Sequence, residues 1–145
     1  MDRSRRFEFL EHTADAYVAA YGRTLSEAFE NAALALFETM TDLDKIDPRK
    51  EDCIEVKAKD AYELLYNWLE ALLVRFDTEQ MLFSRFRVLD LTEVQNDFRI
   101  KAQACGERFD PRKHVQKVGV KAVTYHRMEI IQKPKDVTVK FILDL

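Results

Sequence analysis

Residues 60–76 read DAYELLYNWLEALLVRF, and this stretch carries a strongly apolar pattern with helical spacing. Asp60 and Glu63 stand three residues apart, as do an N-cap residue and its capping-box partner at the start of a helix. Apolar residues then recur three or four positions apart, which is the spacing of one helical face. They are Leu64, Leu65, Trp68, Leu69, Leu72, Leu73 and Phe76. The stretch therefore predicts a helix with one face buried against other elements.

An earlier stretch, residues 24–40, carries the same two signals. Thr24 and Glu27 have capping-box spacing, which satisfies two backbone amides at a helix start. The apolar residues that follow again have helical spacing: Ala28, Phe29, Ala32, Ala33, Leu36, Phe37 and Met40. The sequence thus predicts two helices, and each has an apolar face that needs a covering layer.

Outside these helices, apolar and polar residues largely alternate, as they do in strands with one wet face. We expect about seven strands on this pattern, at residues 7–10, 16–21, 54–58, 82–94, 98–102, 118–131 and 137–143. Turn residues at 95–97 and 133–136 join two pairs of them as hairpins. Because the strands come largely in adjacent pairs, we predict an α+β two-layer sandwich. It has a mostly antiparallel or mixed sheet and both helices on one face.

The length of 145 residues predicts a single domain, residues 1–145. The longest uninterrupted apolar run is residues 32–37, far short of a membrane span. A polar N-terminus is not followed by the apolar region of a signal peptide. Cys53 and Cys105 lie far apart and form no C-x-x-C motif, so we expect a reducing, cytoplasmic setting. The net charge of −3 does not favour bulk attraction to nucleic acid or anionic membrane.

Several common catalytic motifs are missing from the sequence. The three glycines are widely separated, at Gly22, Gly106 and Gly119. This spacing argues against a glycine-rich phosphate loop, and neither a G-x-S-x-G motif nor a paired-histidine zinc motif occurs. Residues 42–47 place aspartates as in the start of a calcium loop, but the acid and the glycine needed later in that loop are missing. We interpret residues 42–47 as a solvated connection.

Two carboxylates at strand borders are candidate metal ligands. Asp15 precedes the apolar run 16–21, and Asp144 follows the last predicted strand. A turn cap would explain Asp15, and a frayed terminus would explain Asp144. If the strands beside them are neighbours, however, these side chains converge with the terminal carboxylate of Leu145. Such hard oxygen ligands suit Ca²⁺, Mg²⁺ or Mn²⁺ rather than zinc, and a cation removes their mutual repulsion.

The remaining candidates are basic. His12, His114 and His126 have no metal-ligand spacing, so surface or satisfied core histidines are the simplest interpretation. Alternation over residues 120–126 places Lys121 on one strand face. There it could neutralise the acidic groups or contact an anionic partner, and a solvated strand face is the alternative.

Several stretches, spread over essentially the whole chain and in matching order, resemble the archease family. They are Glu11-His12-Thr13-Ala14-Asp15, residues 22–29, Lys113-His114, residues 120–126 and the final Asp144-Leu145. The departures are small. Val123 stands where the family often has isoleucine, and Ala16 stands where a larger aliphatic residue is usual.

This resemblance implies a non-catalytic accessory protein. Archeases activate RtcB-type RNA-splicing ligases in tRNA splicing by promoting ligase guanylylation with GTP, so that the ligase turns over many times. The family's metal site, usually described with calcium, maps onto Asp15, Asp144 and Leu145, with magnesium or manganese as alternatives. RNA is then contacted indirectly, through the ligase. Candidate contacts with the partner or its nucleotide are Lys121, His12 and His126.

Two other functions remain open. The same carboxylates could position water in a small metal-dependent phosphohydrolase, although His12 and His126 are the sole candidates for a general base. The family has also been proposed to act as chaperones or modulators of RNA-processing enzymes such as tRNA methyltransferases. Direct RNA binding is the least expected role, because the one compact basic cluster is Arg3, Arg5 and Arg6 in an acidic chain.

Overall fold

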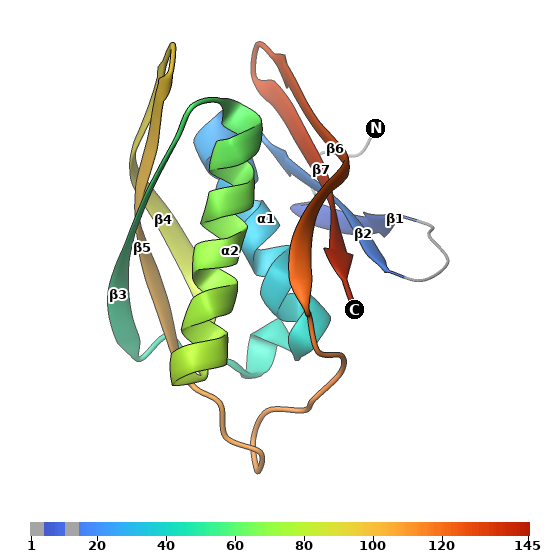
Figure 1. Cartoon of the computed structure of the whole chain (residues 1–145). Coiled ribbons are helices and arrows are strands. Elements are labelled where there is room, and N and C mark those ends of the chain that lie inside the picture. Colours follow the sequence, from blue (N-terminus) through green and yellow to red (C-terminus); the bar gives the residue numbers. More distant parts are fainter. Residues whose placement is uncertain (1–4, 11–14) are drawn as a thin grey trace.

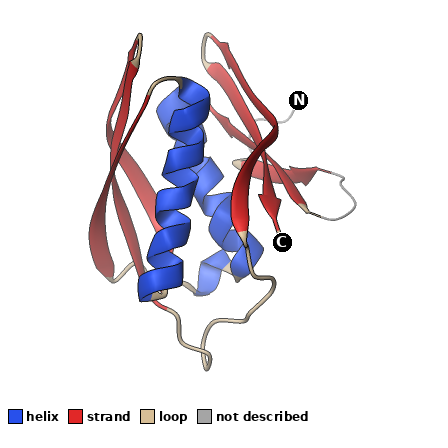
Figure 2. Cartoon of the chain, viewed as in Figure 1, coloured by secondary structure: helices blue, strands red, loops and turns tan. Residues whose placement is uncertain are grey.

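A computed structural model of the chain describes residues 5–10 and 15–145. The described residues form seven strands, two long helices and a short 3-10 turn at Leu43–Lys45 (Figure 2). In chain order the strands and long helices are β1 (Phe7–Leu10), β2 (Ala16–Gly22), α1 (Leu25–Met40), β3 (Lys50–Ala58), α2 (Ala61–Glu79), β4 (Met81–Val94), β5 (Asp97–Arg108), β6 (Ala122–Lys133) and β7 (Asp136–Asp144).

The strands form two antiparallel sheets, and the two helices lie between them (Figure 1). One sheet has the order β1-β2-β7-β6 and the other has the order β3-β5-β4. Helix α1 contacts β2 and β7 of the first sheet and β4 of the second, while α2 contacts β6 of the first and β3 of the second. The predicted α+β sandwich is confirmed, but the single sheet with both helices on one face is not: the strands divide between two sheets, and the helices pack against both of them. Neither described helix is long and apolar enough to cross a membrane.

Both helices begin where the capping boxes predict. The Glu27 backbone N–H donates to Thr24 Oγ1 at 3.1 Å, and the Glu63 N–H donates to Asp60 Oδ1 at 2.8 Å. Each glutamate in turn accepts a hydrogen bond of 2.9 Å from the N–H of the residue before the cap. These reciprocal bonds satisfy amides that the helices leave unpaired, so they fix the start of each helix.

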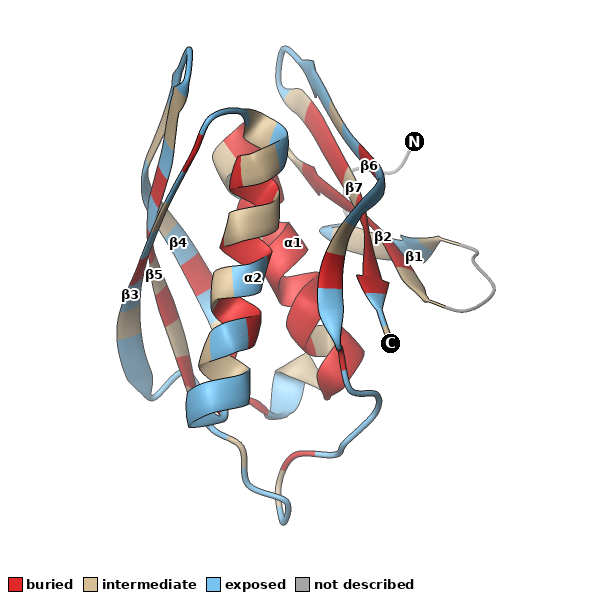
Figure 3. Cartoon of the chain, in the orientation of Figure 1, coloured by how far each residue is buried: buried red, intermediate tan, exposed pale blue. Residues whose placement is uncertain are grey.

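The core lies along the helices, where both apolar stripes are buried (Figure 3). Trp68 of α2 is fully buried, and its indole N–H donates to the Phe29 carbonyl of α1 at 3.0 Å. Its ring meets Phe86 of β4 edge-on, at a centroid distance of 6.0 Å. Trp68 therefore joins the two helices to the three-stranded sheet, as the apolar pattern of residues 60–76 predicts.

Strand β6 differs from its predicted form in two ways. It begins at Ala122 instead of residue 118, because residues 109–121 form a long connection from the other sheet. It also contains a β-bulge, since its register with β7 shifts between Thr124 and Glu129. Val123 and Met128 both face the core although they are five residues apart, which strict alternation does not allow. The bulge is accompanied by a left-handed backbone at Arg127, with φ of 57°.

Candidate functional site

The ends of three neighbouring strands bring the candidate ligands together. In the pairing of β2 with β7, the last pair at this end is Ala16 opposite Leu143. Asp15 and Asp144 are therefore the next residues of the two segments. On the other side of β7, Ala122 of β6 lies opposite Asp144. The pairing of β2 with β7 meets the condition under which the two aspartates lie at the same end of the sheet.

Sheet alternation places both carboxylates away from the helices. Val18 of β2 and Phe141 and Leu143 of β7 belong to the core between the sheets. Because side chains alternate along a strand, Asp15 and Asp144 fall on the opposite, outer face. Asp144 is exposed there. Leu145 packs partly buried against the core, so the last residue is held near the two aspartates.

Lys121 borders the same place. Its backbone N–H donates to the Asp144 carbonyl at 2.7 Å, which extends the β6–β7 pairing by one residue, and its side chain is exposed. His126 lies further along β6, exposed, with its backbone N–H donating to Thr124 Oγ1 at 3.0 Å. His12 lies outside the described residues. We call Asp15, Asp144, Leu145 and Lys121 together the carboxylate end.

The donor set at the carboxylate end is one of hard oxygens. Neither Asp15 nor Asp144 has a side-chain hydrogen bond or ion pair with another residue in the described part of the chain. Within that same part, no group of three or more histidine, cysteine, aspartate or glutamate side chains is placed to hold a metal. The carboxylates of Asp15 and Asp144 and the backbone oxygen of Leu145 are hard donors, a type that Ca²⁺ prefers and zinc does not.

Arg127 is a neighbour of this end that the motifs in the sequence do not predict. Its guanidinium lies 5.0 Å from the centre of the Tyr17 ring, in a cation–π contact. Tyr17 is two residues from Asp15, which is about 7 Å along an extended chain. The β-bulge carries Arg127 to this position, and the failed alternation between residues 123 and 128 was the signal that could have revealed it. The contact places a cation over Tyr17, near the end of β2 that follows Asp15.

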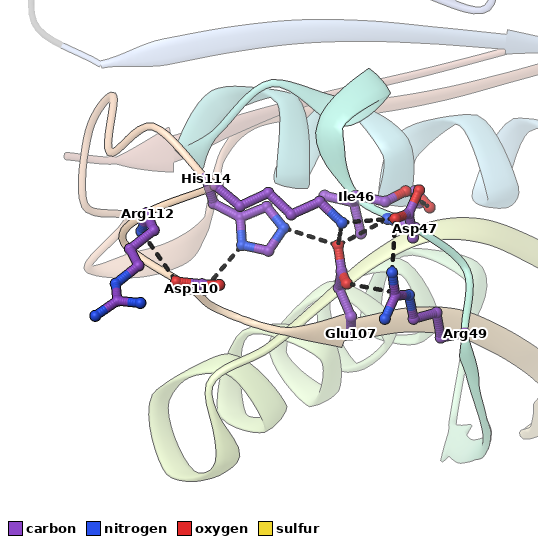
Figure 4. Close-up of polar contacts among 9 residues, drawn as sticks. Ile46, Asp47, Arg49, Glu107, Asp110, Arg112 and His114 are labelled. Carbon is purple, nitrogen blue, oxygen red and sulfur yellow. Dashed lines mark hydrogen bonds and ion pairs between the residues drawn. The ribbon is translucent and has the colours of Figure 1, made fainter.

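A second cluster of charged residues holds the β5–β6 connection, which leads to Lys121, against β5 (Figure 4). Glu107 Oε2 accepts hydrogen bonds from Lys113 Nζ at 2.7 Å, His114 Nε2 at 2.9 Å and the Asp47 backbone N–H at 2.9 Å. The buried His114 ring also accepts the Asp110 N–H at Nδ1, so its proton resides on Nε2. The interpretation of His114 as a satisfied core histidine is confirmed.

These contacts keep Glu107 ionised. Burial on its own raises the pKa of a carboxyl group, but hydrogen bonds from Lys113, Asp47 and His114, with the charge of Lys113, lower the pKa of Glu107 to about 2. The same arrangement raises the pKa of Lys113 through its bonds to Asp47 and Glu107. With Glu107 bonded to Lys113, His114 and the Asp47 amide, the cluster acts as a structural clamp between β5, residues 46–49 and the β5–β6 connection.

We expect this clamp to make stability depend on acid pH. The pKa of Glu107 lies below its ordinary value of 4.5, so its contribution is complete above about pH 5 and is lost as the pH falls toward 2. Glu107→Gln should lower the free energy of unfolding at pH 7 by about 3 kcal/mol and flatten the acid decline. Urea denaturation at pH 7 and pH 3 measures both effects. If the stability of variant and wild type fell equally between pH 7 and pH 3, the clamp would be contradicted. As a control, Glu129→Gln at an exposed position should change the free energy of unfolding by less than about 0.5 kcal/mol.

Comparison with known proteins places the chain in a family. Residues 7–145 match the family described as "Archease protein family (MTH1598/TM1083)". This chain belongs to the archease family. A protein archease of Sulfurisphaera tokodaii is 46% identical over 142 residues, which cover 97% of this chain and 99% of that protein. One from Sulfolobus acidocaldarius is 48% identical over 141 residues, with the same coverage.

Solved structures of archeases have the same fold. Methanobacterium thermoautotrophicum protein 1598, solved in solution, matches with a TM-score of 0.83 and 43% identity, and the match covers 97% of this chain and 99% of that one. The crystal structure of a Thermotoga maritima archease, described as a possible chaperone, matches with a TM-score of 0.60 over 95% of this chain and 96% of that one. Its identity is 16%, so it shows the fold alone. The resemblance read from the sequence is thereby confirmed at the level of the archease family.

Proposed function

We propose that this protein activates an RtcB-type RNA-splicing ligase in tRNA splicing, promoting guanylylation of the ligase with GTP and repeated turnover. The observation that carries the proposal is the carboxylate end of an archease-family chain. Asp15 and Asp144 lie on adjacent strand ends, on the outer face, and without a partner in the described part of the chain. Carboxylates left free by the fold are available to a ligand or partner.

A divalent cation fits this role. Asp15, Asp144 and an oxygen of Leu145 would hold it, with Ca²⁺ as the first candidate and Mg²⁺ or Mn²⁺ as alternatives. When bound, such an ion offers open coordination positions to phosphate oxygens. The cationic Lys121 and Arg127 border the same end and would attract the phosphates of a nucleotide held by the ligase. The sequence contains no nucleotide-binding loop, so we place the guanylyl transfer on the ligase and treat this chain as non-catalytic.

Ligase guanylylation tests the proposal directly. Ligase, labelled GTP and a divalent ion are mixed with and without this protein, and covalent ligase–GMP is followed over time. We expect the protein to raise the rate of ligase–GMP formation and to form no labelled adduct itself. An unchanged rate with active ligase and folded protein would contradict the proposal.

Lys121 provides a prediction about the partner contact. Lys121→Gln should weaken activation by on the order of tenfold, because a border cation steers an anionic partner site. Lys121→Arg should keep most of it. The main-chain bond from residue 121 to Asp144 survives in both variants, so the difference between them reports the side-chain charge. Lys101→Gln, an exposed lysine of the other sheet, is the matched control. Equal activity of Lys121→Gln and wild type would show that the Lys121 side chain takes no part in the partner contact.

The second candidate function is that of a chaperone or modulator of RNA-processing enzymes such as tRNA methyltransferases. A member of the same family, the Thermotoga maritima archease, is described as a possible chaperone. Protection of several unrelated enzymes from thermal aggregation would support this function if it survives the loss of both Asp15 and Asp144. Dependence of all activity on the two aspartates would support the ligase proposal instead.

A further inference from the structure

Positively charged side chains line a pocket at the end of β7 that is opposite Asp144. A pocket of about 320 Å³ has four cationic side chains in its lining, Arg5, Arg6, Arg23 and Lys135. They come from three separate parts of the chain: the residues before β1, the turn between β2 and α1, and the turn between β6 and β7. Figure 1 shows that the β6–β7 turn and the start of α1 lie at the same end of the molecule. We call this hollow the cationic pocket.

The acidic groups in the cationic pocket are already bonded within the fold. Glu27 accepts the Arg23 backbone N–H at 2.9 Å as part of the α1 capping box. Glu30 accepts the Val88 backbone N–H at 2.7 Å. Burial raises the pKa of Glu30, an effect that the bond from Val88 opposes. Both carboxylates are thus held by main-chain amides, and they face four cations in the lining, so positive charge is in excess.

Three of the four cations are free of carboxylate partners. The Arg6, Arg23 and Lys135 side chains form no ion pair with any residue that the structure describes, whereas Arg5 contacts Glu8 at 3.0 Å. Cations gathered around a concave, low-dielectric surface concentrate the local field and attract anions. The guanidinium group also matches phosphate geometry with two parallel N–H donors.

The backbone at Lys135 is a further indication. Lys135 has a left-handed backbone with φ of 59°, and it follows Pro134 in the turn between β6 and β7. A turn with proline first and a left-handed residue second favours glycine or asparagine at the second place. A lysine there is conformationally less favourable, and strained positions of this kind cluster at ligand sites. Here the turn presents its cation to the pocket.

We propose that the cationic pocket binds the phosphate groups of a nucleotide or of a nucleic-acid strand. Its volume lies at the lower end of the range for small-ligand pockets, about 300–1,000 Å³, which suits one phosphate–sugar unit. The nine residues of β7 separate it from Asp144 by about 26 Å, at ~3.3 Å per residue. The pocket is therefore a second site, independent of the carboxylate end. It is a local positive surface on a chain whose net charge is −3.

An NMR titration of the full chain tests the pocket. Amide chemical shifts are followed while inorganic pyrophosphate, ATP or a twelve-nucleotide poly(U) RNA is added in separate experiments. We expect the shifts to cluster at residues 22–27 and 133–136. Arg23→Gln/Lys135→Gln should weaken binding by about tenfold or more, because each phosphate contact is charge-assisted. Arg87→Gln/Lys57→Gln removes the same charge from exposed positions of the other sheet and should bind as wild type does.

The probes separate the two phosphate sources. Binding of ATP that is at least as tight as that of pyrophosphate, with no tighter binding of RNA, identifies a site for free phosphate compounds such as nucleotides. Tighter binding of RNA, with a salt slope that falls by about one for each cation removed, identifies a strand site. The proposal is overturned if none of the three probes shifts the pocket amides, or if the two double variants bind alike. The amide spectra themselves report folding, and Arg6→Gln serves as a further pocket variant.

Discussion

Asp144→Asn should abolish the stimulation of ligase guanylylation while the protein stays folded. Asparagine keeps the shape of aspartate but removes the charge that a divalent ion requires. Loss of groups that merely orient metal ligands weakens metal binding about 10–100-fold, so loss of a ligand should exceed that range. Asp144 is exposed and its backbone pairing with Ala122 is independent of its side chain. Unfolding free energy should therefore change by less than about 0.5 kcal/mol.

Three measurements on the Asp144 variant separate function from folding. Ligase–GMP formation gives the activity, calorimetric titration with Ca²⁺ gives the metal affinity, and thermal denaturation gives the stability. Asp15→Asn should behave in the same way, because it faces the same end of the sheet. Asp77→Asn, an exposed aspartate of α2, is the matched control and should activate like wild type. Full stimulation by both Asp15→Asn and Asp144→Asn would show that a metal at this end takes no part in the mechanism.

The largest effect on stability is expected from Trp68→Ala. Trp68 is fully buried, contacts Phe86 and donates to the Phe29 carbonyl. Truncation of a buried tryptophan leaves a cavity and costs about 3–5 kcal/mol. Domains are stable by only about 5–15 kcal/mol, so the variant should lose a large share of its stability. Urea denaturation followed by circular dichroism measures the loss.

Two further variants separate the parts of the Trp68 effect. Trp68→Phe keeps most of the apolar volume and removes the indole N–H. Apart from the packing that is lost, the missing hydrogen bond should lower the free energy of unfolding by about 1 kcal/mol. Tyr62→Ala changes an exposed aromatic of the same helix and should cost less than about 0.5 kcal/mol. A loss below about 1 kcal/mol for Trp68→Ala would contradict the place given to it at the centre of the core.

The elements of the fold could be predicted where local chemistry decides them. The capping boxes at Thr24 and Asp60 set the helix starts, and the spacing of apolar residues identified the buried faces. The division into two sheets could not be predicted in this way. Alternation indicates that a strand has an inner face, but it does not reveal its partner. Here β2 pairs with β7 from the far end of the chain.

The two aspartates of the carboxylate end could also be predicted from local sequence patterns. Asp15 and Asp144 stand out because aspartate is unfavourable in strands and both border apolar runs. Arg127 is harder to find, since its position over Tyr17 depends on a bulge that only the broken alternation between residues 123 and 128 indicates. The cationic pocket was also hidden, because its arginines and lysine come together only through the tertiary fold. Residues near Arg5 looked like an isolated basic cluster.

The most direct test of the proposed function is multiple-turnover RNA joining by an RtcB-type ligase, with this protein present in substoichiometric amount. Ligase, RNA with joinable ends, GTP and a divalent ion are combined, and the moles of RNA joined per mole of ligase are counted. We predict that wild-type protein raises this number well beyond a single turnover and that the Asp15→Asn/Asp144→Asn double variant does not. Equal turnover with and without the folded wild-type protein would contradict the proposed function.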